Sequence, residues 1–242
     1  MKVVVLHGGG SALSDQGDRW ALLNVVPNLP VHLLQPHAGL GDGEVRSVVL
    51  TDSHIDHVGG LLNMREGSPI DLYATPAVFE TLSQGMPVLQ VLQQYCGVHW
   101  HVIPVAGETL SASFRVDGLP GLEFTALATE GLSLPGVPRQ EAAWTTGHSI
   151  ALGVRELATG QRLFCAPGAQ WLGAGEVDWM RDADCVLVDD HTRWPDEAPV
   201  ATWRAQRKVL LGKGVGKGAG TATQRASTDG FEAAFDGMVI EL

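Results

Sequence analysis

The sequence predicts an α/β (α+β) fold in which strands and helices are mixed along one domain, residues 1–242. Short runs rich in β-branched residues alternate with segments of helical periodicity from one end of the chain to the other. Hydrophobic residues make up 45% and charged residues 18% of the 242 residues, which is enough apolar side chain for a sizeable core. Since no Pro- or Ser-rich linker interrupts this pattern, one domain is the simplest interpretation.

In the first half of the chain, aliphatic and β-branched residues cluster in five short runs. These predict strands at Val3–Leu6, Arg19–Asn24, Val45–Leu50, Asp71–Ala74 and His99–Val105. Helical spacing predicts helices at Gly59–Arg65, Pro76–Ser83 and Val88–Tyr95, and Pro76 suits the first turn of its helix.

The second half of the chain repeats this alternation. Strands are expected at Leu122–Ala126, Ser149–Arg155, Arg162–Cys165, Cys185–Val188, Lys208–Leu211 and Val239–Leu242. One short helix is expected at Val177–Asp182. The segment Thr129–Thr145 has little pattern and is expected to be a surface loop, and the Gly-rich Lys213–Thr228 is expected to be mobile.

The charge balance and the cysteines narrow the class of protein. With 16 Lys and Arg against 27 Asp and Glu, the net charge of −11 counts against a nucleic-acid partner, which needs a basic surface. The apolar run Val3–Leu6 is too short for a signal sequence or a membrane span. Three widely spaced cysteines suit buried thiols in a reducing cytoplasm. We therefore expect a cytoplasmic protein, and a homodimer is one open alternative for its oligomeric state.

The most informative segment is Thr51–Gly60, which follows the strand expected at Val45–Leu50. Within six residues it contains four potential metal ligands, Asp52, His54, Asp56 and His57. A tight loop at the end of a strand can direct these side chains into one cleft, and imidazole with carboxylate suits zinc, iron or manganese. The alternative is a polar loop with a helix-capping Asp and solvated histidines. The density of ligands favours a metal site.

This segment is similar to the signature of the metallo-β-lactamase superfamily, which reads His-x-His-x-Asp-His. His54, Asp56 and His57 occupy three of its positions, and Asp52 stands in place of the first histidine. In that superfamily the first two histidines bind one metal ion and the Asp-His pair binds a second. The resemblance therefore implies that the change at Asp52 weakens the first site more than the second.

Further blocks resemble one family of that superfamily, the pyrroloquinoline quinone (PQQ) biosynthesis proteins B, or PqqB. The similar blocks follow one another in order over most of the chain: Thr51–His57, Gly60–Gly67, Tyr95–His101, Arg162–Gly168, Ala183–Asp189 and Phe235–Leu242. The resemblance implies a four-layer αββα metallo-β-lactamase-like sandwich with a metal cleft at the edge of its sheets. It also implies a role in PQQ biosynthesis, as an iron-dependent oxygenase or hydroxylase acting on a tyrosine-derived precursor.

The same resemblance implies that the chain is a divergent and shortened member of the PqqB family. The Cys-rich structural zinc motif that the family carries after its first strand is absent, since no cysteine precedes Cys96. Asp189 stands where the superfamily has its metal-bridging Asp, but the Gly-His-x-Pro stretch expected after it is missing. Gly212 follows Arg207–Leu211, where the family has a histidine ligand.

The expected site holds one divalent transition metal, Fe(II) or Zn(II). By this resemblance, the chain retains three metal ligands: Asp56, His57 and Asp189. Asp52 and His54 would line the open side of the site. His148 or His191 could replace the missing histidine ligand. Asp56 is the candidate catalytic residue. Iron would activate dioxygen against a small-molecule or peptide-derived substrate. The alternatives are a zinc metallohydrolase, or a non-catalytic protein that binds or transports PQQ or a precursor.

Overall fold

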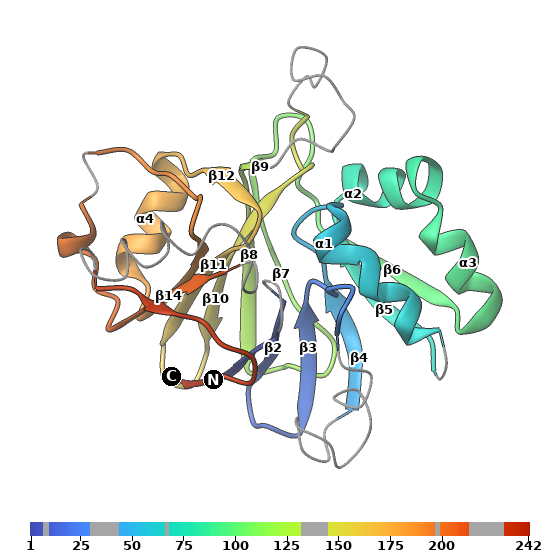
Figure 1. Cartoon of the computed structure of the whole chain (residues 1–242), viewed down its shortest axis with the longest axis horizontal. Coiled ribbons are helices and arrows are strands. Elements are labelled where there is room, and N and C mark those ends of the chain that lie inside the picture. The colour runs from blue at the N-terminus through green and yellow to red at the C-terminus, as the bar shows by residue number, and fades with distance from the viewer. Residues whose placement is uncertain (7–9, 30–43, 66–67, 132–144, 197–198, 213–229) are drawn as a thin grey trace.

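Two seven-stranded β-sheets lie face to face in the computed structural model of the chain, and helices cover their outer faces (Figure 1). The structure describes residues 1–6, 10–29, 44–65, 68–131, 145–196, 199–212 and 230–242. The segment expected to be mobile, Lys213–Thr228, and most of the loop expected at Thr129–Thr145 lie outside the described residues.

The first sheet has the strand order β16-β1-β2-β3-β4-β5-β6. Strands β16, β1, β2 and β3 pair antiparallel, while β3, β4, β5 and β6 pair parallel to one another. The strand bounds are β1 Lys2–Val5, β2 Ser11–Ser14, β3 Arg19–Leu23, β4 Glu44–Val49, β5 Ile70–Ala74, β6 Val98–Val102 and β16 Val239–Glu241.

The second sheet has the order β15-β14-β13-β11-β10-β8-β7. Strands β7, β8, β10 and β11 pair antiparallel, and β11, β13, β14 and β15 pair parallel. The bounds are β7 Ser111–Phe114, β8 Leu122–Ala128, β10 Ile150–Glu156, β11 Arg162–Ala166, β13 Cys185–Asp189, β14 Arg207–Leu211 and β15 Glu232–Ala233. A separate ribbon pairs β9 Glu130–Gly131 with β12 Ala169–Trp171.

Side chains of the strands alternate between two faces, and this alternation creates the layers. On β4, for example, Val49 belongs to the core between the sheets, while its neighbour Val48 belongs to the core beneath the first helical layer. On β11, Cys165 likewise faces the inner core, and Phe164 faces the helical layer of the second sheet. The predicted four-layer αββα sandwich is therefore confirmed.

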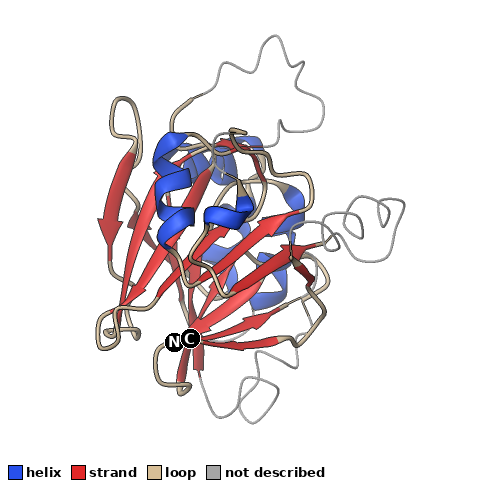
Figure 2. Cartoon of the chain, turned by 90° about the vertical axis from the view of Figure 1, so that its left-hand side faces the viewer, coloured by secondary structure: helices blue, strands red, loops and turns tan. Residues whose placement is uncertain are grey.

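The helices are short, and several begin at caps that the sequence contains. The first layer consists of α1 Ile55–Val58, the 3₁₀ helix Gly59–Met64, α2 Pro76–Glu80, a π-helical turn at Thr81–Gly85 and α3 Val88–Tyr95. The opposite layer contains α4 Ala174–Asp182 (Figure 2). Thr75 caps α2 through its side-chain oxygen, which accepts a hydrogen bond from the Val78 N–H, and Pro76 begins that helix as predicted.

Most predicted elements are present, with corrections in detail. The segment expected to be only a loop at residues 51–58 contains α1, and the helix expected at Gly59–Arg65 is a 3₁₀ helix. The strand expected at His99–Val105 ends at Val102. Five strands were not expected: β2, β7, β9, β12 and β15.

All three cysteines are buried and free, as predicted. Among the helices of these ranges, none has the length and apolar character needed to cross a membrane.

Candidate metal centre

The candidate ligands lie where parallel strands of both sheets end. The segment Thr51–His57 follows β4 of the first sheet, and Asp189 is the last residue of β13 in the second sheet. An isolated antiparallel bridge joins Asp52 to Ser149, just before β10, so the two sheets meet here. Ligands that are distant in the sequence are thereby brought to one edge of the sandwich.

Hydrogen bonds within the first loop fix its shape. The Asp52 carboxylate accepts a hydrogen bond of 2.8 Å from the His54 N–H, and His54 Nδ1 accepts one of 3.3 Å from the Asp56 N–H. His54 is thus the N-cap of α1, the helix that carries Asp56 and His57. Gly60 allows the following turn to approach the chain closely, because a Cβ there would lie 2.2 Å from the Val26 carbonyl oxygen.

Asp52 and His57 form a buried pair. The Asp52 Oδ2 to His57 Nδ1 distance is 2.7 Å, and the side chains are 11% and 7% exposed. Burial alone would lower the pKa of His57, but the Asp52 carboxylate, followed by the charges of Asp189 and Asp56, outweighs this effect and raises the pKa above 6.5. His57 therefore holds its proton more strongly than an ordinary histidine.

Asp189 lies on the other side of the site. Its Oδ2 accepts a hydrogen bond of 2.7 Å from the Gly168 N–H. Burial raises its pKa above the ordinary 3.8, although the Gly168 hydrogen bond and the charges of His191 and His57 act against that rise. His191 Nε2 lies 3.8 Å from the same carboxylate oxygen and is a buried atom without a hydrogen-bond partner.

Gly168 joins the two sides. It has a φ of +76°, and a Cβ at this position would lie 2.6 Å from Asp52 Oδ2 and 2.7 Å from His57 Cε1. Since its N–H binds Asp189, this one residue lies between Asp189 on one side and the Asp52 carboxylate and the His57 imidazole on the other. Gly168 was not among the predicted site residues, although its place in an Ala-Pro-Gly turn directly after β11 is a signal in the sequence.

The structure brings some of the predicted site residues together and leaves others apart. Asp52, His57 and Asp189 surround Gly168, whereas Asp56 is 43% exposed and lies 3.6 Å from His54 Nδ1. Of the two replacement candidates, His191 lies beside Asp189, while His148 is exposed on the segment that precedes Ser149. Within the described ranges, no three Asp, Glu, His or Cys side chains are already gathered as a metal-binding group.

The chemistry of these donors nevertheless fits a divalent metal ion. The site combines three carboxylates with the buried imidazole of His57, and Nε2 of His191, a buried atom without a hydrogen-bond partner, is a donor atom that a cation would satisfy. His57 uses Nδ1 for Asp52 and keeps Nε2 for a ligand, which is the usual arrangement of a carboxylate behind a metal-binding histidine. A bound cation would also offset the charge that now raises the pKa of His57.

A cavity lies close to this centre. It has a volume of about 400 Å³ and is lined by Ala128, Thr129, Glu130, Thr145, Thr146, Trp171, Gly173 and Glu176. Thr129 connects it to the centre, since the Thr129 N–H donates to the carbonyl of Ser149, the residue bridged to Asp52. Trp171, which is 40% exposed, contributes an aromatic surface to the cavity.

Comparison with known proteins identifies the family. A β-lactamase superfamily domain model matches residues 19–229. A coenzyme PQQ synthesis protein B from Nitrosococcus oceani is 34% identical over 208 residues, which cover 83% of this chain and 67% of that protein. The chain belongs to the PqqB family. A second PqqB, from Pseudomonas syringae pv. tomato, is 37% identical over 77% of this chain, but the match spans only 61% of that protein's length.

Solved structures agree with this fold. Zn²⁺-bound PqqB from Methylobacterium extorquens has a TM-score of 0.73 and 20% sequence identity, with the whole of both chains covered. Unliganded yeast PDE1 has a TM-score of 0.66 at 9% identity, covering 100% of this chain and 99% of that one. The predicted resemblance to PqqB and its superfamily is thus confirmed by sequence, and the αββα architecture by structure.

Proposed function

We propose that this PqqB relative acts in PQQ biosynthesis as a metal-dependent enzyme. The proposal rests on the family and on one observation, the convergence of Asp52, His57 and Asp189 on Gly168. Asp56, His57 and Asp189 would hold one divalent metal ion, with His191 as an additional ligand. Asp52 would orient His57, and His54 would line the open side of the centre.

The metal would be Fe(II) for an oxygenase or hydroxylase, where it supplies the binding and activation of dioxygen. The surrounding residues position the substrate and handle its protons. Asp56 is suited to accept a proton from a substrate hydroxyl, because it is the most exposed carboxylate of the set and stands on the rim of the centre. The buried Asp52–His57 pair keeps the imidazole fixed and excludes water from that side.

The cavity next to the centre would receive the substrate. Its Thr129, Thr145 and Thr146 side chains offer hydroxyl groups, and Trp171 offers a ring surface for stacking. These features suit a small aromatic molecule or one derived from a peptide, such as a tyrosine-derived precursor. Glu130 and Glu176 would favour a substrate that carries an amino group.

The experiment that tests the metal-dependent reaction is anaerobic reconstitution with Fe(II), followed by measurement of oxygen uptake with a tyrosine-derived diphenol. We expect uptake that requires Fe(II) and is lost in Asp56→Ala, while the surface variant Asp182→Ala behaves like the unchanged protein. Hydrolysis of an ester or phosphodiester with Zn(II) would support the metallohydrolase instead. Binding of PQQ or the diphenol without turnover would support a carrier.

The pathway assignment needs a separate test, because the match spans only part of some curated relatives. A bacterium that lacks its own PqqB should regain PQQ production when it expresses this chain. The assignment would be wrong if this chain is folded in the strain but does not restore PQQ production, while a PqqB relative expressed in the same strain restores it.

A further inference from the structure

A second polar site lies between the two sheets, away from the candidate metal centre. Its cavity has a volume of about 210 Å³ and is lined by Arg19, Trp20, Ser47, Asp71, Asp117, Gly118 and Leu119. Arg19 begins β3 and Asp71 is the second residue of β5, whereas the metal-centre loop follows the other end of β4. The two sites are therefore separate.

The inner face of the first sheet becomes polar at this cavity. Ser47 on β4 is opposite Asp71 on β5, and Asp71 is opposite His99 on β6. Two residues further along β4 and β5, Val49 and Tyr73 belong to the core between the sheets. Because side chains alternate along a strand, Ser47 and Asp71 share this inward face.

Asp71 is held in place by two histidines. Its Oδ1 lies 3.1 Å from His101 Nε2 and 3.4 Å from His99 Nδ1. His101 itself stacks on Tyr73, with ring centroids 4.4 Å apart. Both histidines engage the same carboxylate oxygen, so Oδ2 remains available to a ligand.

Asp117 is anchored through its backbone. The Ser47 hydroxyl donates a hydrogen bond of 3.1 Å to the Asp117 carbonyl, and the Asp117 N–H donates one of 2.9 Å to the Tyr73 hydroxyl oxygen. In the part of the chain that the structure describes, neither the Asp117 carboxylate nor the Arg19 guanidinium has a hydrogen bond or an ion pair. The loop is thus fixed, while its carboxylate stays available.

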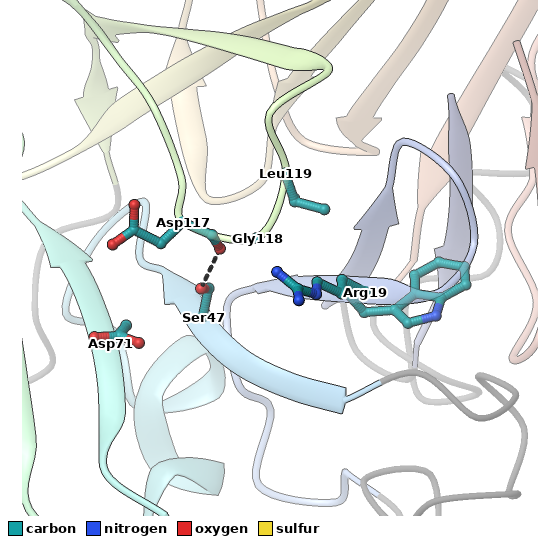
Figure 3. A pocket seen from close by; sticks show the side chains of 7 residues that line it. Arg19, Ser47, Asp71, Asp117, Gly118 and Leu119 are labelled. Atoms are coloured by element: carbon teal, nitrogen blue, oxygen red, sulfur yellow. Dashed lines mark hydrogen bonds between the residues drawn. The ribbon is translucent and has the colours of Figure 1, made fainter.

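Arg19 faces the two carboxylates across the cavity. Figure 3 shows the guanidinium on one side of Ser47, with Asp71 and Asp117 on the other. Gly118 allows this arrangement, because its φ of +89° is a backbone conformation that side chains with a Cβ rarely adopt. The cavity therefore offers one cationic wall and one anionic wall.

We propose that this cavity binds a free α-amino acid. The carboxylate of the ligand would pair with the planar Arg19 guanidinium, which suits bidentate carboxylate binding, and its ammonium would lie between Asp71 and Asp117. A simple cation would leave Arg19 unused, and a simple anion would face two carboxylates. The Leu119 side of the cavity offers an apolar contact for the ligand's side chain.

Calorimetric titration of the full chain, treated with EDTA so that no metal takes part, tests this inference. L-alanine and L-leucine are the probes, with L-alaninamide and N-acetyl-L-alanine as analogues that lack the carboxylate or the ammonium. We expect the analogues to bind at least about tenfold more weakly than L-alanine, since each loses a charge-assisted contact.

Variants assign the two walls. Arg19→Gln should weaken the binding of L-alanine about tenfold, so that L-alanine no longer binds more tightly than L-alaninamide. In Asp117→Asn, L-alanine should no longer bind more tightly than N-acetyl-L-alanine. Arg204→Gln and Asp182→Asn, which change similar exposed residues outside this cavity, should leave binding unchanged. Thermal unfolding shows whether each variant is folded. If Arg19→Gln is unfolded, Arg19→Lys, which loses the planar guanidinium, takes its place in the titrations.

Three results would overturn the inference. The first is no heat of binding with either amino acid. The second is equal affinity for L-alanine and L-alaninamide, which would indicate a site for amines alone. The third is L-alanine affinity that does not change in Arg19→Gln and Asp117→Asn, because the amino acid would then bind elsewhere.

Discussion

The Asp52 carboxylate lies 2.7 Å from Nδ1 of His57, at a position where the superfamily motif has a histidine. We predict that Asp52→Asn lowers the affinity for Zn(II) or Fe(II) by about 10–100-fold, the range typical of residues that orient a metal-binding histidine. An asparagine keeps the size of the side chain but loses the charge that supports the imidazole. Equilibrium dialysis with metal analysis measures the change.

Asp182→Asn is the matched control for this prediction, because its carboxylate is 68% exposed and pairs only with the surface residue Arg162 among its described contacts. If Asp52→Asn bound metal as tightly as this control, Asp52 would have no part in orienting His57.

Replacing Gly168 should damage both the fold and the site. Gly160→Ala provides the comparison, since Gly160 has nearly the same backbone angle (φ +77° against +76°) but nothing within 4 Å of its Cβ position. We expect Gly160→Ala to lower the free energy of unfolding by about 1–2 kcal/mol through backbone strain alone. Gly168→Ala should cost about 1–3 kcal/mol more, because its methyl group would collide with Asp52 and His57.

Urea unfolding of the two variants measures this difference. Metal binding should fall in Gly168→Ala and stay unchanged in Gly160→Ala. Equal losses of stability in both variants would mean that Gly168 is needed only for its backbone angle.

Gly212 stands where the resemblance to the family implies a histidine ligand. Leu211, the residue before it, is opposite Asp189 across β13 and β14, and nothing lies within 4 Å of the Gly212 Cβ position. We predict that Gly212→His raises metal affinity by about tenfold or more, since an imidazole here would add a ligand to the proposed metal centre. Gly175→His, at another open position, controls for an added surface histidine.

Competition with a fluorescent zinc chelator measures both variants. Equal affinities in Gly212→His and Gly175→His would show that residue 212 cannot reach the metal.

The raised pKa of His57 gives the metal-free protein a defined pH dependence. Because the folded state holds this proton more tightly than the unfolded chain, the stabilisation is complete below pH 6.5 and is lost as pH rises through the higher folded value. The midpoint of urea unfolding should therefore be higher at about pH 6 than at about pH 8. His57→Gln should reduce this dependence, whereas His148→Gln, which alters an exposed histidine, should retain it. An identical pH dependence in His57→Gln would contradict the assignment.

Local patterns predicted the elements that are determined locally. The β-branched run Val45–Leu50 and the Pro-initiated helix at Pro76 are present because their own residues favour those conformations. Strand β2 was missed since its sequence, Ser-Ala-Leu-Ser, is short and half polar, and both serines are fully buried between β1 and β3. Its strand structure depends on distant pairing partners, which periodicity does not reveal.

The site shows the same division. The spacing of the sequence predicted that Asp52 and His57 lie near each other, but it did not reveal that the Asp52 carboxylate pairs with the His57 imidazole. It also did not show that Gly168 lies between them and Asp189, because this depends on the meeting of two sheets. Metal ligation by the five named residues, the single domain over 1–242, the homodimer and the absence of a nucleic-acid partner stay predictions.

The bridge between Asp52 and Ser149 has a consequence for folding kinetics. His57 and Asp189 come from segments far apart in the chain, so the centre can form only after both sheets have folded and docked. Metal binding would then report the last step of folding, and a bound ion would slow unfolding because it links the two sheets. Stopped-flow refolding with a zinc-sensitive dye would time the docking of the two halves directly.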